Sequence, residues 1–372
     1  MKLLCVRANH FKNCADGYEI DLIARSRKTA EDKEYELQEI APELYVYNTA
    51  AFIGKNASGK TSAVELLDCC YSILGDFRLE GKHYIYQGIE LEIFFYHEDS
   101  VYLYTVTLGE DTTLGNQATF RDEHIYRKPY YKTNLKDIYR KETFDELTGL
   151  GDLPEDTSDI FFVLKKRQTR AIYCDSFGDG ADTYQLMFRA LRNYQISTDV
   201  LATILRIFDE NIEELTRLDD HNYRLVFRGE ERMLSDTQLV YMLSSGTTKG
   251  MLLYTLMVAS LQGGFDLLVD EIENHFHKTL VENMISLYKD KTVNKHNASL
   301  IFTTHYCEVL DQMGRQDNIW ICKADVQVYL SNMYSDYRIR PELLKSKQYY
   351  GNAFQTAVNY EELMNLKREL KK

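Results

Sequence analysis

The chain has 372 residues, of which 44% are hydrophobic and 27% are charged, so its composition is that of a globular protein and excludes disordered or collagen-like chains. Its length corresponds to about two or three domains, or to one domain with a large insertion. The formal net charge of −13 argues against non-specific binding of the whole surface to nucleic acid or to an anionic membrane. Binding of nucleic acid through a local basic cleft is still compatible with this net charge.

The seven cysteines include no CxxC pair, which favours reduced thiols in a cytoplasmic protein over a disulfide framework or a zinc site. The N-terminus has no long apolar core and is not a signal peptide. The longest apolar run, residues 251–261, is too short to cross a bilayer.

The N-terminal part is predicted to alternate strand and helix. An apolar run at 3–6 predicts an edge or first strand, and a run at 44–53 predicts a strand that ends at a glycine-rich turn. Apolar residues then recur at helical spacing over 61–74. Alternating residues at 89–95, a polar turn and an apolar run at 101–108 predict an antiparallel hairpin.

Residues 110–240 are predicted to form a mainly helical insertion of mixed structure, with helical periodicity over 198–218. Clear helix and strand patterns then return in the C-terminal part. Its predicted helices are 251–261 and 279–287, and its predicted strands are 265–269, 299–303 and 319–323. Continuously apolar strands that alternate with helices indicate an α/β fold with a parallel sheet.

A phosphate-binding loop is the strongest motif in the chain. Residues 54–61, Gly-Lys-Asn-Ala-Ser-Gly-Lys-Thr, match G-x-x-x-x-G-K-[ST] between a predicted strand and a predicted helix. Composition gives only about 0.01 chance matches in this length. Backbone N–H groups and the helix N-terminus would surround the phosphates, Lys60 would reach the β- and γ-phosphates, and Thr61 would bind Mg²⁺. The predicted nucleotide contacts are Gly54, Asn56, Ala57, Ser58, Gly59, Lys60, Thr61 and Ser62.

Two acids follow the strand at 265–269. Asp270 would bind Mg²⁺, and Glu271 would be the base that polarises the attacking water. Taken alone, such a pair is more often a solvated strand end. Together with a phosphate loop, a catalytic role is the better interpretation, because ligands of α/β sheets bind at the carboxyl ends of the strands.

Two further segments flank Asp270. Ser244, Ser245 and Gly246 open a helix 24 residues before it, which is either an N-cap or a second anion site. The strand at 299–303 leads to His305, 35 residues after Asp270. That histidine is either structural or a hydrogen-bonding partner of the γ-phosphate or the attacking water.

The order of these motifs resembles the ABC-type ATPases. Within them it is most similar to the SMC/RecF/OLD-related branch, and closest to the stand-alone AAA-family ATPases of abortive-infection and phage-defence operons. The resemblance covers residues 40–80 and 240–355 and leaves the central region unmatched. The segments that carry it are Asn56, Ser-Ser-Gly-Thr at 244–247, Asp-Glu-Ile-Glu-Asn-His-Phe-His at 270–277, and residues 315–320 and 323–325.

The resemblance implies an ABC-type (RecA-like) ATPase head with an antiparallel β subdomain and the mainly helical insertion. Residues 1–109 would form its N-terminal half, 110–240 an insertion or lid, and 241–330 its C-terminal half with the signature helix, followed by a tail at 331–372.

The resemblance also implies a homodimer, or a higher assembly, in which two heads close over two ATP molecules. Ser244, Ser245 and Gly246 of one head would contact the γ-phosphate held by Lys60 of the other, and residues 274–277 would lie at the dimer contact. Lys12, in a stretch similar to the N-F-[RK]-S segment of the branch, would contact nucleotide. The glutamine of the lid loop has no assigned residue.

These features favour a slow, Mg²⁺-dependent ATPase that acts as a switch for a separate effector, a nuclease or toxin, in antiviral defence. The alternative is a DNA-repair or chromosome-maintenance ATPase that binds DNA directly. The basic cluster at 165–170 could grip nucleic acid, although a solvated face is its commoner role. A transporter ATPase is disfavoured because Ser-Ser-Gly-Thr replaces the transporter signature and no clear Gln loop is present.

Overall fold

A parallel β-sheet forms the centre of the molecule in the computed structural model, which describes residues 1–111, 116–175, 188–219, 221–242, 245–274, 277–340, 342–356 and 360–371. Its strand order is β10-β14-β15-β5-β16-β17, and neighbours run parallel except β17, which pairs antiparallel with β16. This topology confirms the predicted α/β fold. The strands are β10 (Ala171–Cys174), β14 (Asp266–Val269), β15 (Leu300–Thr304), β5 (Thr49–Ile53), β16 (Ile319–Ala324) and β17 (Val328–Asn332).

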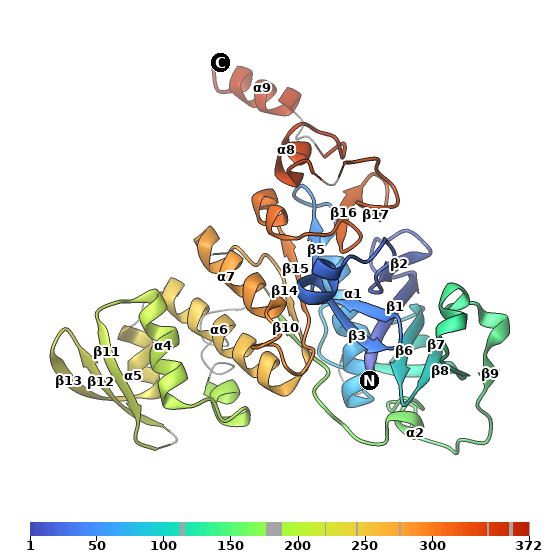
Figure 1. Ribbon diagram of the computed structural model, residues 1–372, viewed down its shortest axis with the longest axis horizontal. Coiled ribbons are helices and arrows are strands. Elements are labelled where there is room, and N and C mark those ends of the chain that lie inside the picture. The colour runs from blue at the N-terminus through green and yellow to red at the C-terminus, as the bar shows by residue number, and fades with distance from the viewer. Residues whose placement is uncertain are drawn as a thin grey trace.

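The two faces of this sheet are covered by different helices. Successive side chains of a strand point to opposite faces, so Ala50 and Phe52 enter the core shared with α1 (Lys60–Asp76), whereas Ala51 and Ile53 enter the other core. That second core holds α6 (Ser245–Gly263) and α7 (Lys278–Lys289). Figure 1 shows α1 on one side of the strands and α6 and α7 on the other.

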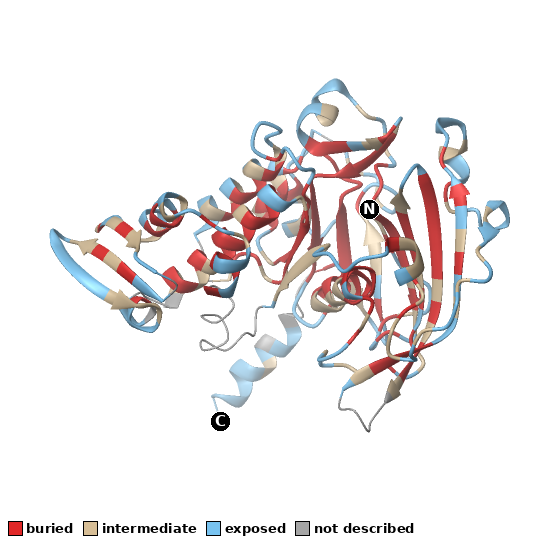
Figure 2. Ribbon diagram, turned by 90° about the horizontal axis from the view of Figure 1, so that it is seen from below, coloured by how far each residue is buried: buried red, intermediate tan, exposed pale blue. Residues whose placement is uncertain are grey.

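An antiparallel sheet packs on the α1 side and confirms the predicted hairpin, with the order β2-β1-β6-β7-β8-β9. Figure 2 shows that its inner strands are largely buried. The strand predicted at 3–6 as an edge or first strand is β1, the first in the chain. It is not an edge strand, because β2 and β6 pair with it on either side. The strands are β1 (Lys2–Asn9), β2 (Tyr18–Asp21), β6 (Glu90–His97), β7 (Ser100–Asp111), β8 (Gln117–Pro129) and β9 (Asp145–Glu146).

The apolar run predicted as one strand at 44–53 is two strands. Asn48 interrupts it: its backbone N–H donates to the carbonyl of Glu36 at 2.9 Å and its side chain donates to the carbonyl of Tyr35 at 2.7 Å. The first half, β4 (Leu44–Tyr47), pairs with β3 (Leu37–Ala41), and only β5 joins the parallel sheet.

The region 110–240 differs from the mainly helical insertion that was expected, because it carries several strands. The expected helix at 198–218 ends at Phe208 as α4 (Thr198–Phe208), and Ile212 and Leu215 belong to β11. Asp209 bonds the backbone and side chain of Asn211 in a local turn that stops the helix. Other elements of this region are α2 (Phe161–Leu164), β11 (Ile212–Arg217), β12 (Asn222–Phe227), β13 (Glu230–Ser235) and α5 (Asp236–Met242), with β11-β12-β13 as an antiparallel sheet beside α4.

Short helices complete the chain, and α9 extends away from the body in Figure 1. In the described part of the chain, no helix combines the length and apolar character needed to span a bilayer. The short helices are η1 (Asp32–Glu36), η2 (Lys132–Asp137), η3 (Lys141–Thr143), η4 (Cys307–Gln312), α8 (Lys345–Tyr350) and α9 (Tyr360–Glu369).

Candidate functional site

The phosphate loop connects β5 to the N-terminus of α1, and its glycines are required by close packing. A Cβ atom at position 59 would lie 2.1 Å from Cγ1 of Val328, and one at position 54 would lie 2.6 Å from the carbonyl oxygen of Cys322. Gly59 has φ +86° and Ala57 has φ +59°. Left-handed residues interspersed in a loop are typical of backbone concavities that bind anions, so the loop has the form that phosphate binding needs.

Lys60 begins α1 and folds back over the loop. Its Nζ donates to the carbonyl oxygens of Gly54 and Lys55, both at 3.2 Å. Burial lowers the pKa of Lys60 from its ordinary value of 10.5, although the nearby carboxylates counteract that shift. Ser62 lies in the same first turn and is half-buried, whereas Asn56 is exposed.

The structure brings Thr61 and Asp270, the two predicted magnesium ligands, together. The Thr61 hydroxyl donates to Oδ2 of Asp270 at 2.9 Å, and Asp270 is only 3% exposed. A hydroxyl and a carboxylate are hard oxygen donors of the kind Mg²⁺ prefers, usually with phosphate oxygens and waters completing the shell. The donor set therefore fits a magnesium ion at this edge of the sheet.

Glu271 and His305 also meet at this edge. Oε1 of Glu271 lies 3.6 Å from Nε2 of His305, and both side chains are about one third exposed (34% and 32%). Glu271 has φ +50°, a left-handed conformation that is uncommon for a residue with a Cβ atom and often occurs at functional sites. The predicted base and the predicted histidine are thus neighbours and accessible from solvent.

Sequence reasoning missed two residues of this site, Thr303 and Glu273. The hydroxyl of Thr303 lies 2.6 Å both from Oδ1 of Asp270 and from the backbone nitrogen of Glu271. Glu273 is 8% exposed and accepts a hydrogen bond from the backbone N–H of His305. Glu273 stands in the recognised segment 270–277 and Thr303 in the strand that leads to His305, but neither residue was assigned a role.

Lys12 lies at the second turn of α1 rather than on the phosphate loop. Its Nζ forms an ion pair with Glu65, and its segment joins β17 through the N–H of Val328, which donates to the carbonyl of Asn13 at 2.8 Å. Val328 in turn contacts Gly59. Contact of Lys12 with nucleotide stays a prediction.

The signature segment is described only in part. Ser244 lies outside the described residues, α6 begins at Ser245, and Gly246 follows in its first turn. Gly250 packs tightly on α4, because a Cβ atom there would lie 2.2 Å from Cε1 of Phe208. Of the expected dimer segment 274–277, positions 275 and 276 also lie outside the described residues.

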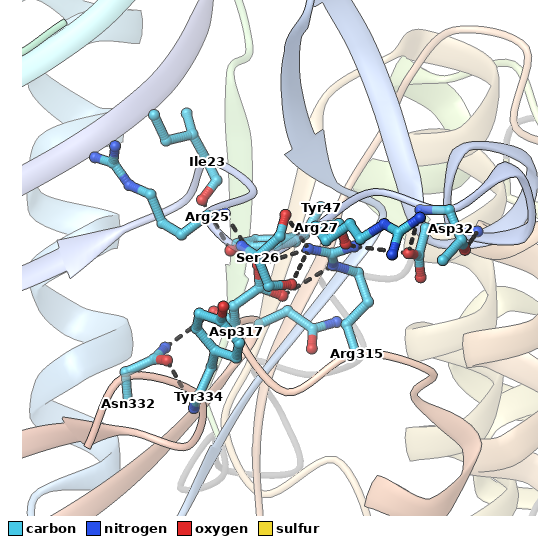
Figure 3. Close-up of polar contacts among 12 residues, drawn as sticks. Ile23, Arg25, Ser26, Arg27, Asp32, Tyr47, Arg315, Asp317, Asn332 and Tyr334 are labelled. Carbon is cyan, nitrogen blue, oxygen red and sulfur yellow. Dashed lines mark hydrogen bonds and ion pairs between the residues drawn. The ribbon is translucent and has the colours of Figure 1, made fainter. Parts of the chain in front are cut away.

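The segment after the histidine holds a buried ion-pair network that lies directly before the start of β16 (Figure 3). The guanidinium of Arg315 contacts Asp317 at 2.6 Å, Asp32 at 3.0 Å and the hydroxyl of Ser26 at 2.5 Å. Asp317 also accepts the backbone N–H groups of Arg25 and Ser26. This cluster joins the N-terminal segment to the start of β16 and is structural.

Comparison with family models identifies the family of this chain. A family model described as an AAA domain, putative AbiEii toxin, Type IV TA system, matches residues 50–311, a stretch that contains the phosphate loop, Asp270 and His305. A comparison with curated proteins returns no match.

Among solved structures, the SMC head domain from Thermotoga maritima is similar at 14% identity, with a TM-score of 0.42, covering 89% of this chain and 99% of that one. The SMC head bound to the C-winged helix domain of ScpA is similar at 12% identity, with a TM-score of 0.46 and coverages of 89% and 97%. The recombination mediator protein RecF with ATP is similar at 8% identity, with a TM-score of 0.35 and coverages of 86% and 97%.

Proposed function

We propose that this chain, which belongs to the AAA-domain family described as a putative AbiEii toxin of a Type IV TA system, binds ATP at residues 54–61 and hydrolyses it. The observation that carries the proposal is the 2.9 Å contact between Thr61 and Asp270. It joins the end of the phosphate loop to the acidic strand end, which are the two halves of a nucleotide-hydrolysing centre.

Binding of the triphosphate would rest on the loop and α1. The backbone N–H groups at the start of α1 carry the positive end of the helix dipole, which favours phosphate oxygens. Lys60 would exchange its contacts with the loop carbonyls for the β- and γ-phosphates. Mg²⁺ held through Thr61 and Asp270 would supply positive charge against the phosphates.

Hydrolysis would depend on Glu271. Its carboxylate would accept a proton from the attacking water as the oxygen–phosphorus bond forms. His305, whose ring nitrogen lies 3.6 Å from that carboxylate, would hold the glutamate or the water in place by a hydrogen bond. Both side chains are partly exposed, as substrate access requires.

The dimer is part of the same proposal. Gly246 lies in the first turn of α6, where backbone N–H groups and the helix dipole favour an anion, which supports a role for this N-terminus toward the nucleotide of a second subunit. Residues 274–277, directly after the acids, would then couple the two sites.

We further propose that this dimer is a switch for a separate effector in antiviral defence. ATP binding would stabilise the closed form and hydrolysis would release it, because a ligand shifts an equilibrium by its differential affinity for the two states. Protein captured from cells with and without phage by the Glu271→Gln variant would identify the effector. Salt-dependent DNA binding by the purified chain alone would instead favour the DNA-repair alternative.

The experiment that tests the function measures phosphate release and molar mass together. The wild-type chain should release phosphate from ATP in the presence of Mg²⁺, and Glu271→Gln should form an ATP-dependent dimer that ADP does not support. A wild-type chain without turnover would refute the proposed ATPase activity. A monomer under every nucleotide condition would refute the dimer that closes over ATP.

A further inference from the structure

One hydroxyl group joins the two acids of the site. Thr303, near the end of β15, is 0% exposed. Its Oγ1 lies 2.6 Å from Oδ1 of Asp270 and 2.6 Å from the backbone nitrogen of Glu271. Since Thr303 is fully buried, it cannot touch substrate and acts only through these two neighbours.

The chemistry of the two contacts fixes the direction of each hydrogen bond. The amide of Glu271 can only donate, so the Thr303 oxygen accepts there and its single proton goes to the carboxylate of Asp270. Among side chains as small as that of threonine, a hydroxyl is the group that can both accept and donate a hydrogen bond. Serine can replace it in this respect, whereas valine, which has nearly the same shape, can do neither.

The backbone of Thr303 adds a third contact to the same turn. Its carbonyl oxygen accepts the N–H of Ile272 at 3.0 Å. Two consecutive amides, those of Glu271 and Ile272, are therefore held by one residue of the neighbouring strand. This matters because Glu271 has φ +50°, a conformation that a residue with a Cβ atom keeps only where its surroundings hold it.

We propose that Thr303 is a positioning residue that sets the metal-binding carboxylate and the base in one fixed relationship. This inference rests on the proposed ATPase function. The hydroxyl of Thr303 occupies Oδ1 of Asp270, so that Oδ2 faces Thr61. The left-handed turn at Glu271 directs the base toward His305. The loss of that hydroxyl should disturb turnover far more than nucleotide binding, since its two hydrogen bonds are to Asp270 and to the amide of Glu271.

The test compares ATP turnover with the affinity for a fluorescent ATP analogue in the full chain. Thr303→Val should lower kcat by about 100-fold, the range expected when a general base is displaced. The affinity for the analogue, and KM, should stay within about threefold of the wild-type values, while Thr303→Ser should retain most of the turnover. A kcat for Thr303→Val close to that of the wild type would overturn the proposal.

Thr49 provides a matched control in the adjacent strand. It is 0% exposed, and its hydroxyl has no hydrogen-bond partner among the residues that the structure describes. Thr49→Val makes the same change of hydroxyl to methyl in the same sheet, so its kcat should equal that of the wild type. An equal loss of kcat in both valine variants would overturn the specific role of Thr303.

Thr303→Ser and Thr303→Ala cover the case in which Thr303→Val does not fold, because both fit the space and differ by one hydroxyl. Equal turnover in this pair would overturn the proposal. Failure of the proposed function looks different: the wild-type chain itself would then release no phosphate, whereas failure of this inference alone leaves an active wild type.

Discussion

The hydroxyl of Thr61 lies 2.9 Å from Oδ2 of Asp270, although 209 positions separate the two residues in the chain. The strand order β14-β15-β5 explains this contact, because parallel strands deliver their carboxyl ends to one edge of the sheet. The two oxygen donors expected to hold a magnesium ion are therefore already adjacent in the fold.

Replacing Asp270 should weaken the effect of magnesium on nucleotide affinity. Asp270→Ala eliminates one of the two protein oxygens, so the gain in affinity on adding Mg²⁺ should fall by about tenfold, as for the loss of one contact to a charged group. Titration of a fluorescent ATP analogue with Mg²⁺ and with EDTA measures this gain. An unchanged magnesium effect would place the cation elsewhere.

Replacing Lys60 should abolish tight nucleotide binding. Lys60→Ala removes the charged donor that we propose contacts the phosphates, and charge-assisted hydrogen bonds contribute about 1.5–3 kcal/mol each, so the affinity should fall about 10- to 100-fold. Calorimetric titration with ATP measures it. Lys166→Ala, at an exposed position, is the control for the loss of a positive charge, and equal effects of both variants would reject the phosphate-loop assignment.

Replacing Glu271 by glutamine should separate binding from chemistry. Glu271→Gln keeps the size of the side chain but removes the proposed proton acceptor, so turnover should fall about 10²- to 10⁴-fold while ATP affinity stays close to that of the wild type. Light scattering should show the ATP-bound dimer accumulating. Turnover at the wild-type rate would identify another residue as the base.

The buried carboxylate of Glu273 gives a finer test of the geometry around His305. It accepts the backbone N–H of His305, and its Oε2 has no hydrogen-bond partner within the described ranges. Glu273→Gln keeps an acceptor oxygen and should preserve turnover, whereas Glu273→Leu loses one hydrogen bond, about 1 kcal/mol, and should lower kcat about fivefold. Steady-state kinetics that show the two variants to be equal would contradict this role.

The Arg315–Asp317 pair should make stability depend on pH. Burial alone would raise the pKa of Asp317, but the hydrogen bonds and charge of Arg315 outweigh it and hold that pKa below its ordinary value of 3.8. The stabilisation is therefore fully present above about pH 4 and is lost as the pH falls through the lowered folded-state pKa.

Asp317→Asn should accordingly lower the free energy of unfolding at pH 7 by about 3 kcal/mol, as expected when one partner of a buried ion pair is removed. The difference between wild type and variant should shrink on acidification below pH 4. Urea denaturation of the wild type and the variant at pH 7 and at a pH below 4 measures this difference. A difference that is the same at both would show that the pair does not titrate with folding.

Much of the site could be predicted from the sequence because its motifs are local. The phosphate-loop motif places its glycines, Lys60 and Thr61 within eight consecutive positions, and the apolar run before Asp270 and Glu271 indicates a buried strand with two acids at its end. Alternating strands and helices likewise indicated the parallel sheet, since each element carries its own periodicity.

Only the tertiary structure decided which neighbours these residues have. The contacts of Thr303 with Asp270 and of Glu273 with His305 each span about thirty positions and exist because β14 and β15 pair in one register. The same holds for residues 212–217, whose apolar spacing fits either a helix or a strand until pairing with β12 selects the strand. A hydrogen bond between strands depends on distance in space, which spacing along the chain does not encode.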